Sequence, residues 1–315
     1  MMRDFDLVIC TIERDIPILE IGLPYMRKYL CPKHIVLIAP RVCHPALDAL
    51  GKKIRGSCDL SLIDEDSLVE GLNKEYVSAL LVARGANPQR SGWYFQQFLK
   101  LCYALSPTAS DYYLVWDADT IPLRPMEFFS KTGKVIFETS KEYNANYFFT
   151  MKNIIEKGKT YAYSFISEHM MMERATVREL LTSICFPSPT SAQEVVRRVI
   201  AAVSDEALSS SGFSEFETYG TFAASKYQDR YEIRSLRSLR HGTMLFGRQP
   251  TVENLFALSC RYWWVSFEAW PISTWMSKMK RWLGGLAGAI WTAAAVRMRG
   301  AAYRAFLAES EAEAQ

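Results

Sequence analysis

The stretch Tyr112-Tyr113-Leu114-Val115-Trp116-Asp117-Ala118-Asp119 decides the fold that we expect. Its first five residues form an apolar run, and Ile121-Pro122-Leu123-Arg124-Pro125 follows, so two prolines end the extended chain soon after Asp119. Side chains at alternate positions of a strand point the same way, which places Asp117 and Asp119 on one face. Open α/β sheets bind ligands at the carboxyl ends of their strands. The stretch therefore predicts a buried strand of an α/β fold that ends in a ligand site.

Two carboxylates in this position suit a hard divalent cation, because such ions prefer oxygen ligands and a substrate diphosphate can complete the coordination. The alternative is a solvated acidic turn. Two other Asp-x-Asp stretches, Asp4-Phe5-Asp6 and Asp64-Glu65-Asp66, do not end a buried apolar run. The preceding strand therefore favours metal and diphosphate binding at the third stretch.

The first 140 residues alternate apolar runs with helical patterns. Strands are expected at residues 7–10, 34–39, 60–63, 112–116 and 134–138, and helices at 17–30 and 91–105. This alternation predicts a doubly wound, mostly parallel sheet with flanking helices, and a nucleotide-binding half at residues 1–140. Residues 141–259 are more helical and are expected to form the second half of the same domain, 1–259. Two sequences there, Ser191-Ala192-Gln193-Glu194 and Ser214-Glu215-Phe216-Glu217, predict capping boxes at helix starts.

Composition excludes several classes of protein. With 315 residues and 49% hydrophobic content, the chain is long enough for one large domain with appendages. A net charge of only +3 gives no field that would favour nucleic acid as a partner. The seven cysteines are scattered and never form Cys-x-x-Cys, which indicates reduced thiols in a cytoplasmic protein. No secretory signal precedes the first expected strand.

Residues 260–315 differ from the rest of the chain. Six of the eight tryptophans lie between Arg261 and Arg299, together with six basic residues and one acid, a net charge of +5. The uncharged run at residues 282–296 would span about 22 Å as a helix, less than the roughly 30 Å of a bilayer core. Aromatic and basic content therefore predicts a helical, amphipathic segment that lies in a membrane interface. The alternative is a pair of core helices packed on the main domain.

Three blocks of sequence resemble bacterial glycosyltransferases of the GT-A fold. They are the helix Trp93-Tyr94-Phe95-Gln96-Gln97-Phe98-Leu99-Lys100, the strand end Trp116-Asp117-Ala118-Asp119, and Ile121-Pro122-Leu123. The chain looks most like transferases of capsule, lipopolysaccharide and exopolysaccharide assembly. Weaker matches lie at Ser167-Glu168-His169-Met170 and at Phe213-Ser214-Glu215-Phe216-Glu217, so the resemblance covers roughly residues 5 to 250. It implies a nucleotide-sugar donor, a UDP-sugar in the first instance, and Mn²⁺ or Mg²⁺. It also implies that residues 141–259 are the acceptor-binding half of the domain.

The resemblance also implies roles for the residues around the metal. Asp119 would hold the ion, with Asp117 on the metal or on the ribose of the donor, and the developing charge of the leaving diphosphate would be stabilised. Such enzymes often add a histidine near the C-terminus, and His241 is the candidate here; the alternative is a solvated loop histidine.

Donor contacts are expected from three further residues. Gln97 and Lys100 fall near one face of their helix and would contact donor phosphate or sugar, unless that face is simply solvated. Thr11 follows the first strand, where such folds bind the nucleotide.

An inverting transfer also needs a general base for the acceptor hydroxyl. Glu215 is the first candidate, because Glu217 would complete the cap of its helix and leave Glu215 free beside the helix N-terminus, which keeps it ionised. Ordinary preference for an acid in the first turn is the alternative. Glu168 and His169 are competing bases, and a retaining reaction stays open.

Two other functions compete with this one. A sugar nucleotidyltransferase would carry a glycine-rich loop after the first strand, whereas Thr11-Ile12-Glu13-Arg14-Asp15 has no glycine. The second alternative is a non-catalytic, membrane-bound scaffold of polysaccharide assembly. The leading hypothesis is a peripheral enzyme on the cytoplasmic face of a bacterial inner membrane, with a glycan or lipid-linked acceptor and no nucleic-acid partner.

Overall fold

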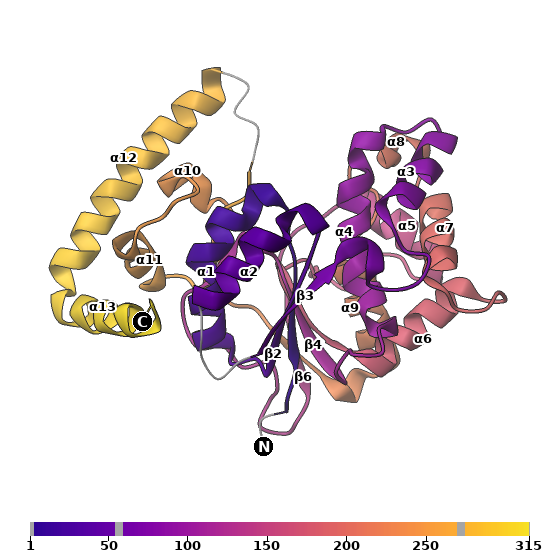
Figure 1. Cartoon of the computed structure of the whole chain (residues 1–315), viewed down its shortest axis with the longest axis horizontal. Helices are drawn as coiled ribbons and strands as arrows, with labels where there is room; N and C mark the ends of the chain where they lie inside the picture. Colours follow the sequence, from indigo (N-terminus) through magenta and orange to yellow (C-terminus); the bar gives the residue numbers. More distant parts are fainter. Residues whose placement is uncertain (1–2, 54–58, 270–274, 315) are drawn as a thin grey trace.

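The computed structural model describes residues 3–53, 59–269 and 275–314, and for 275–282 and 309–314 only the helical backbone. A mixed five-stranded sheet lies at its centre, in the order β3-β2-β1-β4-β7 (Figure 1). Four strands are parallel, namely β1 (Asp6–Cys10), β2 (His34–Ala39), β3 (Asp59–Asp64) and β4 (Tyr112–Trp116), and β7 (His169–Glu173) is antiparallel to β4. This arrangement confirms the predicted α/β fold with a mostly parallel sheet.

Helices cover both faces of the sheet, and this explains why its central strands are continuous apolar runs. Figure 1 shows α1 (Ile16–Leu30) and α2 (His44–Lys53) on one side, with α4 (Ser91–Cys102), α6 (Arg174–Cys185) and α9 (Glu215–Lys226) on the other. The remaining helices of the main body are α3 (Lys74–Ala83), α5 (Ala145–Ile155), α7 (Ala192–Ala202), α8 (Asp205–Leu208), α10 (Gly242–Phe246) and α11 (Val252–Ser259).

The strand expected at residues 134–138 forms, but not in the central sheet. As β6 (Val135–Glu138) it pairs in parallel with β8 (Tyr231–Arg234), while β5 (Thr120–Pro122) pairs with β9 (Trp264–Ser266). The main hydrophobic core takes residues from both predicted halves, from Phe5 to Tyr231, and also Trp264 from the segment that follows them. A short strand carries no local signal for its partner, so its apolar pattern alone suggested the wrong sheet.

Both predicted capping boxes form only in part. The Ser191 side chain accepts from the Glu194 N–H, but the Glu194 carboxylate accepts from Arg197 and Arg198 on its own helix and does not return to Ser191. An arginine one turn away offers the carboxylate a charged donor, and this outcompetes the neutral backbone N–H of the cap.

The C-terminal segment forms two helices, α12 (Trp275–Met298) and α13 (Gly300–Ala314), beside α10 and α11 (Figure 1). One face of α12 packs closely: a Cβ on Gly284 would lie 2.3 Å from the Met244 carbonyl oxygen, and one on Gly288 would lie 2.8 Å from that of Leu245. Ala295 of α12 and Phe306 of α13 belong to a second core that includes Tyr25 of α1. The inner face of the segment is therefore core, as the alternative prediction had it.

The described tryptophans of the segment pack against protein. Trp264 is buried in the main core, Trp263 lies under the Arg124 guanidinium, and Trp291 meets Tyr262 edge to face at 6.0 Å. Trp264 is therefore closed to a membrane interface, whereas Trp263 and Trp291 are half-buried and use part of their apolar area in these tertiary contacts. Trp270 and the side chains of Trp275 and Trp282 lie outside the described part of the chain. None of the described helices is long and apolar enough to cross a membrane.

Candidate functional site

The two aspartates follow β4 at the carboxyl edge of the sheet, where the sequence placed them. Three backbone hydrogen bonds fix this turn: Asp117 N–H donates to the Glu168 carbonyl at 3.0 Å, Thr120 N–H to the Asp117 carbonyl at 3.0 Å, and Phe267 N–H to the Asp119 carbonyl at 2.8 Å. The last bond comes from a segment almost 150 residues away. The turn is therefore held between β7 and the chain that follows β9.

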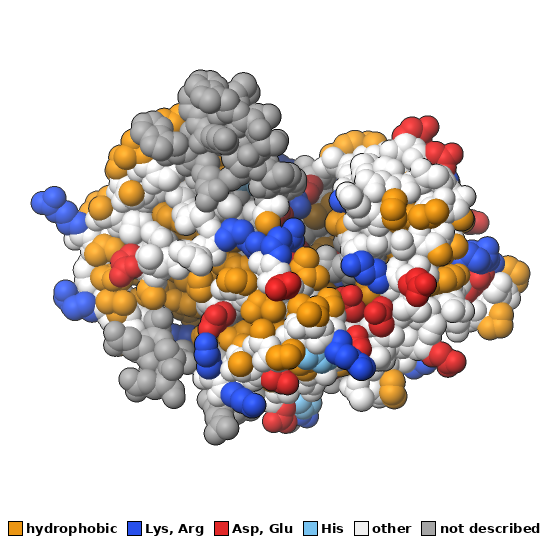
Figure 2. All heavy atoms as spheres, turned by 45° about the horizontal axis from the view of Figure 1, so that its top comes forward, with side chains coloured by type: hydrophobic (Ala, Val, Ile, Leu, Met, Phe, Trp, Pro, Cys, Tyr) orange, Lys and Arg blue, Asp and Glu red, His pale blue; other side chains and the backbone are white. Residues whose placement is uncertain are grey.

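A cavity of about 390 Å³ opens over this turn, and most of the predicted site residues line it. They are Gln97, Lys100, Asp117, Asp119, Glu168 and Glu215, which come from α4, the turns after β4 and before β7, and the start of α9. Figure 2 shows a hollow on this side of the molecule with acidic and basic side chains around it. The structure thus gathers residues separated by more than 100 positions into one site.

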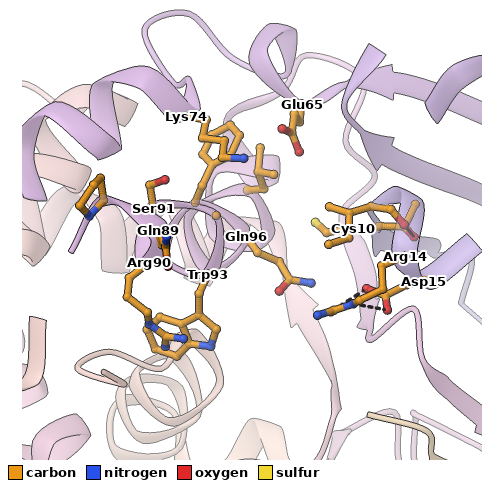
Figure 3. Close-up of a pocket in the computed structure, with 16 residues that line it drawn as sticks. Cys10, Arg14, Asp15, Glu65, Lys74, Gln89, Arg90, Ser91, Trp93 and Gln96 are labelled. Atoms are coloured by element: carbon orange, nitrogen blue, oxygen red, sulfur yellow. Dashed lines mark hydrogen bonds and ion pairs between the residues drawn. The ribbon is translucent and has the colours of Figure 1, made fainter. Parts of the chain in front are cut away.

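A second cavity of about 680 Å³ adjoins the first, beyond the end of β1. Thr11 lines it, as expected for the residue after the first strand, together with Glu65 and Lys74. Arg14 and Gln96 line both cavities and reach into the space from opposite sides (Figure 3). The two cavities therefore adjoin along a shared wall, and the smaller one reaches Asp117 and Asp119.

Lys100 is buried, and its ammonium bridges two of the predicted residues. It donates to Asp117 at 2.7 Å and to Glu215 at 2.8 Å. Burial lowers the pKa of Lys100, but these two carboxylates outweigh it and hold the pKa above its ordinary value. The Gln97 amide lies against the same Glu215 carboxylate and donates to it when its nitrogen faces that way. The alternative prediction, a solvated face of α4, is therefore wrong at these two positions, because they belong to a buried charge cluster.

This cluster changes the interpretation of Glu215. Ser214 caps α9 by accepting from the Glu217 N–H, but the Glu217 carboxylate accepts from the Ser164 hydroxyl at 2.6 Å and from the Phe165 N–H at 2.9 Å. Glu217 does not complete the cap, so the premise that left Glu215 free was wrong. Glu215 is almost fully buried and is the counterion of Lys100.

Glu168 has a different environment in the same cavity. One carboxylate oxygen accepts from the Trp264 indole N–H at 3.0 Å, and the other lies 3.7 Å from Arg240 Nε. Its φ of 60° is left-handed, which a non-glycine residue adopts at a cost of order 1–3 kcal/mol when its surroundings enforce it. Burial, and then the nearby Asp117, Glu268 and Asp119, raise the pKa of Glu168 to about 7 against the effect of the Trp264 bond.

His169 and His241 lie away from this cavity. His169 stacks on Trp116 at 4.5 Å between ring centroids and meets Trp264 at 4.6 Å, and burial lowers its pKa to about 3. It is an uncharged core side chain, so a role as general base is wrong. His241 is exposed and does not line the cavity, although the preceding Arg240 does.

The site offers a hard cation some of its oxygen ligands, but the protein alone does not supply a complete set. Burial, followed by the charges of Asp117, Asp15 and Glu268, raises the pKa of Asp119 to about 7, and a bound cation would relieve this crowding. Across residues 3–53, 59–269 and 275–314, no three His, Cys, Asp or Glu side chains are grouped to hold a metal. The predicted triad of Asp117, Asp119 and His241 is therefore not formed, and two carboxylates are the oxygen ligands on offer.

Several charged residues of the site were missed by the sequence interpretation. Arg14 and Asp15 follow β1 and form an ion pair, and Arg248 donates to Asp15 and to the Arg14 carbonyl, which ties this loop to the chain after α10. Arg240 pairs with Glu142 and, at 2.8 Å, with Glu268. Position after the first strand was a usable signal for Arg14, but only tertiary structure reveals the others.

An α/β fold with a mixed, mostly parallel five-stranded sheet, flanking helices and an acidic site at its carboxyl edge defines the class of this protein. The chain belongs to a family of unknown function, DUF6492, whose model matches residues 6–234. That range contains both aspartates, Lys100, Glu168 and Glu215. A comparison with curated proteins finds no match.

Several solved structures are similar in chain arrangement at low identity. The apo form of mouse xyloside xylosyltransferase 1 is 11% identical over 84% of this chain and 97% of its own, with a TM-score of 0.47. The apo structure of the bifunctional glycosyltransferase WbbM is 10% identical over 85% and 46%, with a TM-score of 0.48. The galactosyltransferase LgtC, bound to donor and acceptor sugar analogues, is 10% identical over 89% and 95%, with a TM-score of 0.40.

Proposed function

We propose that this chain is a metal-dependent glycosyltransferase that moves a sugar from a nucleotide-sugar donor, a UDP-sugar in the first instance, to a hydroxyl group of a glycan or lipid-linked acceptor. The observation that carries the proposal is the pair of adjoining cavities, which share Arg14 and Gln96 and of which the smaller one is lined by Asp117 and Asp119. The larger cavity has the size of a ligand site and the smaller one holds the acidic and basic groups that sugar transfer needs.

The donor would lie along this space. Its nucleoside would occupy the larger cavity beside Thr11, and its diphosphate would pass Arg14, whose guanidinium suits phosphate oxygens. Asp117 and Asp119 would hold Mn²⁺ or Mg²⁺, with diphosphate oxygens and water as the remaining ligands. When bound, the ion would stabilise the charge that develops on the leaving nucleoside diphosphate.

The buried charge cluster would fix the sugar end of the donor. The Lys100 ammonium pairs with Asp117 and keeps it in place, and Glu215 in turn pairs with Lys100. We assign Glu215 this positioning role, because its carboxylate already has a cationic partner and cannot take a proton from an acceptor without losing that pair.

Glu168 is then the better placed general base for an inverting transfer. It lines the cavity beside both aspartates, and the Trp264 N–H leaves its other oxygen directed toward Arg240 and the open space. A base held in a fixed orientation can accept the acceptor proton as the new glycosidic bond forms.

The base assignment predicts different kinetics for two isosteric variants. Glu168→Gln keeps an acceptor for the Trp264 N–H but removes the base, so we expect turnover to fall by about 10²-fold or more with donor affinity retained. Glu142→Gln is the matched control, since Glu142 also pairs with Arg240 but does not line the cavity. Steady-state rates and donor titrations measure both. Loss of turnover in Glu215→Gln, with Glu168→Gln active, would return the role to Glu215.

Donor binding can be tested before any acceptor is known. A thermal-shift screen of nucleotide sugars, with and without Mn²⁺, should show a rise in Tm for UDP-sugars that requires the metal, because a ligand bound only by the folded state stabilises it. A Tm that no nucleotide sugar raises would contradict the proposal, as would a rise that Mn²⁺ does not affect.

We also propose the setting predicted from composition: assembly of bacterial cell-surface glycans such as lipopolysaccharide or capsule, by a peripheral protein on the cytoplasmic face of the inner membrane. Its support is the basic character of residues 261–299.

A further inference from the structure

The outer face of α12 carries an apolar stripe that the fold does not use. Leu283, Leu286 and Ile290 are 50%, 51% and 63% exposed and recur at spacings of three and four residues, so they lie along one side of the helix. The opposite side is the one that Gly284 and Gly288 bring against α10. α12 is therefore apolar on its solvent-exposed side as well as on the side that packs against α10.

Apolar exposure continues to the C-terminal end of α12. Its last residue, Met298, is 77% exposed and stands between the exposed Arg297 and Arg299. Arg297 follows Ile290 by seven residues and so lies on the same side of the helix as the stripe. Figure 2 shows hydrophobic side chains exposed beside basic ones at the end of the molecule where α12 and α13 lie. Single exposed apolar residues are ordinary on protein surfaces, but an aligned row marks an interaction site.

Charge decides between the possible occupants of this surface. The α12 sequence has Lys278, Lys280, Arg281 and Arg297 and no acidic residue. Pairing with α12 of a second copy, in either direction, would bring basic residues against basic residues, which is unfavourable. An anionic surface would instead be attracted to this helix, whose sequence has no acid to oppose it, and each basic residue near such a surface contributes favourably.

We propose that the outer face of α12 docks on an anionic lipid bilayer. The helix lies in the plane of the interface, Leu283, Leu286, Ile290 and Met298 enter the acyl boundary, and Arg297 and Arg299 remain at the level of the lipid phosphates. This surface takes the role of membrane contact that the sequence suggested for the tryptophans, because the described tryptophans pack against protein. It deepens the proposed setting but stands apart from the transfer chemistry, because docking requires neither donor nor metal.

Sedimentation of the full-length protein with vesicles tests the apolar part. We expect binding to vesicles of phosphatidylcholine with a quarter phosphatidylglycerol, and at least about tenfold weaker binding of the double variant Leu286→Ser/Ile290→Ser, because two partly exposed aliphatic side chains lose their insertion. Val82→Ser is the matched control: Val82 is 56% exposed on α3, at the other end of the molecule, and its loss should not affect binding. An unchanged Tm confirms that each variant folds.

A second variant separates charge from apolar insertion. Arg297→Ala/Arg299→Ala should weaken binding to the anionic vesicles by about tenfold, and raised salt should weaken the wild type while leaving residual binding. Vesicles of phosphatidylcholine alone should bind wild type and this variant equally weakly.

Three results would overturn the proposal. The first is wild-type protein that does not bind anionic vesicles, and the second is Leu286→Ser/Ile290→Ser protein that binds them as strongly as wild type. The third is a wild-type protein that does not bind vesicles but is a dimer in sedimentation velocity, while the same variant is a monomer. In the last case the surface pairs with a second copy of the chain. Sugar transfer to a soluble acceptor would still be measurable in every case, so failure of docking is distinct from failure of the proposed reaction.

Discussion

Asp119→Ala should abolish sugar transfer, with a loss of turnover of about 10³-fold or more, while the protein remains folded. The reason is that Asp119 would hold the cation that stabilises the leaving diphosphate, a contribution of several kcal/mol to the transition state, and each 1.4 kcal/mol is about tenfold in rate. Folding should not suffer, because burial and then the neighbouring carboxylates raise the pKa of Asp119, so its removal relieves an unfavourable buried charge and its repulsion. Rates with and without added Mn²⁺, together with Tm, measure both expectations.

Asp4→Ala is the control for this experiment. Asp4 belongs to another Asp-x-Asp stretch, is largely exposed and pairs only with Lys33 among the described contacts, so its loss should leave transfer unchanged. Full activity of Asp119→Ala, or wild-type activity that survives a metal chelator, would contradict the role of the two aspartates.

Lys100→Met should cause the largest loss of stability, about 3–5 kcal/mol in the free energy of unfolding. The substitution leaves Glu215 buried without its counterion and removes the partner of Asp117, and an unpaired buried charge is costly. Adding Glu215→Gln should recover part of the loss, because the deeper of the two carboxylates is then neutral. Urea unfolding of the single and double variants measures the coupling between the two residues.

Lys33→Met provides the comparison, since Lys33 pairs with Asp4 at the surface, where ion pairs contribute little. If Lys100→Met costs no more than Lys33→Met, or if the double variant is no more stable than the single one, the ammonium of Lys100 does not hold the cluster together.

The sheet was predictable because its strands are short apolar runs separated by helical patterns. Strands buried on both faces need apolar residues at nearly every position, and this can be recognised from the local sequence. The strand order and the two small sheets were not, since the pairing of Val135–Glu138 with Tyr231–Arg234 joins segments about 100 residues apart. The C-terminal segment was ambiguous for a related reason: tryptophan favours both membrane interfaces and protein cores, and only the partners Glu168 and Tyr262 decide for Trp264 and Trp291.

The site shows the same division between local and tertiary information. Asp117 and Asp119 were predictable from the strand that precedes them, and Gln97 and Lys100 from their spacing on one helix. That Lys100 is buried, and that Glu215 is its counterion, follows only once α9 packs beside α4. The orientation of His241 was likewise hidden, because the sequence does not reveal which of two neighbours, Arg240 or His241, turns toward the cavity.

The central claim is that Asp117 and Asp119 mark a metal-dependent site for a nucleotide sugar. Its most direct test is release of nucleoside diphosphate from a panel of nucleotide sugars, measured with Mn²⁺ and with a chelator, for wild type, Asp119→Ala and Asp4→Ala. We predict release from at least one UDP-sugar, dependent on the metal, lost in Asp119→Ala and retained in Asp4→Ala. Release that is equal in wild type and Asp119→Ala, or no release from any sugar nucleotide of the panel, would contradict the claim.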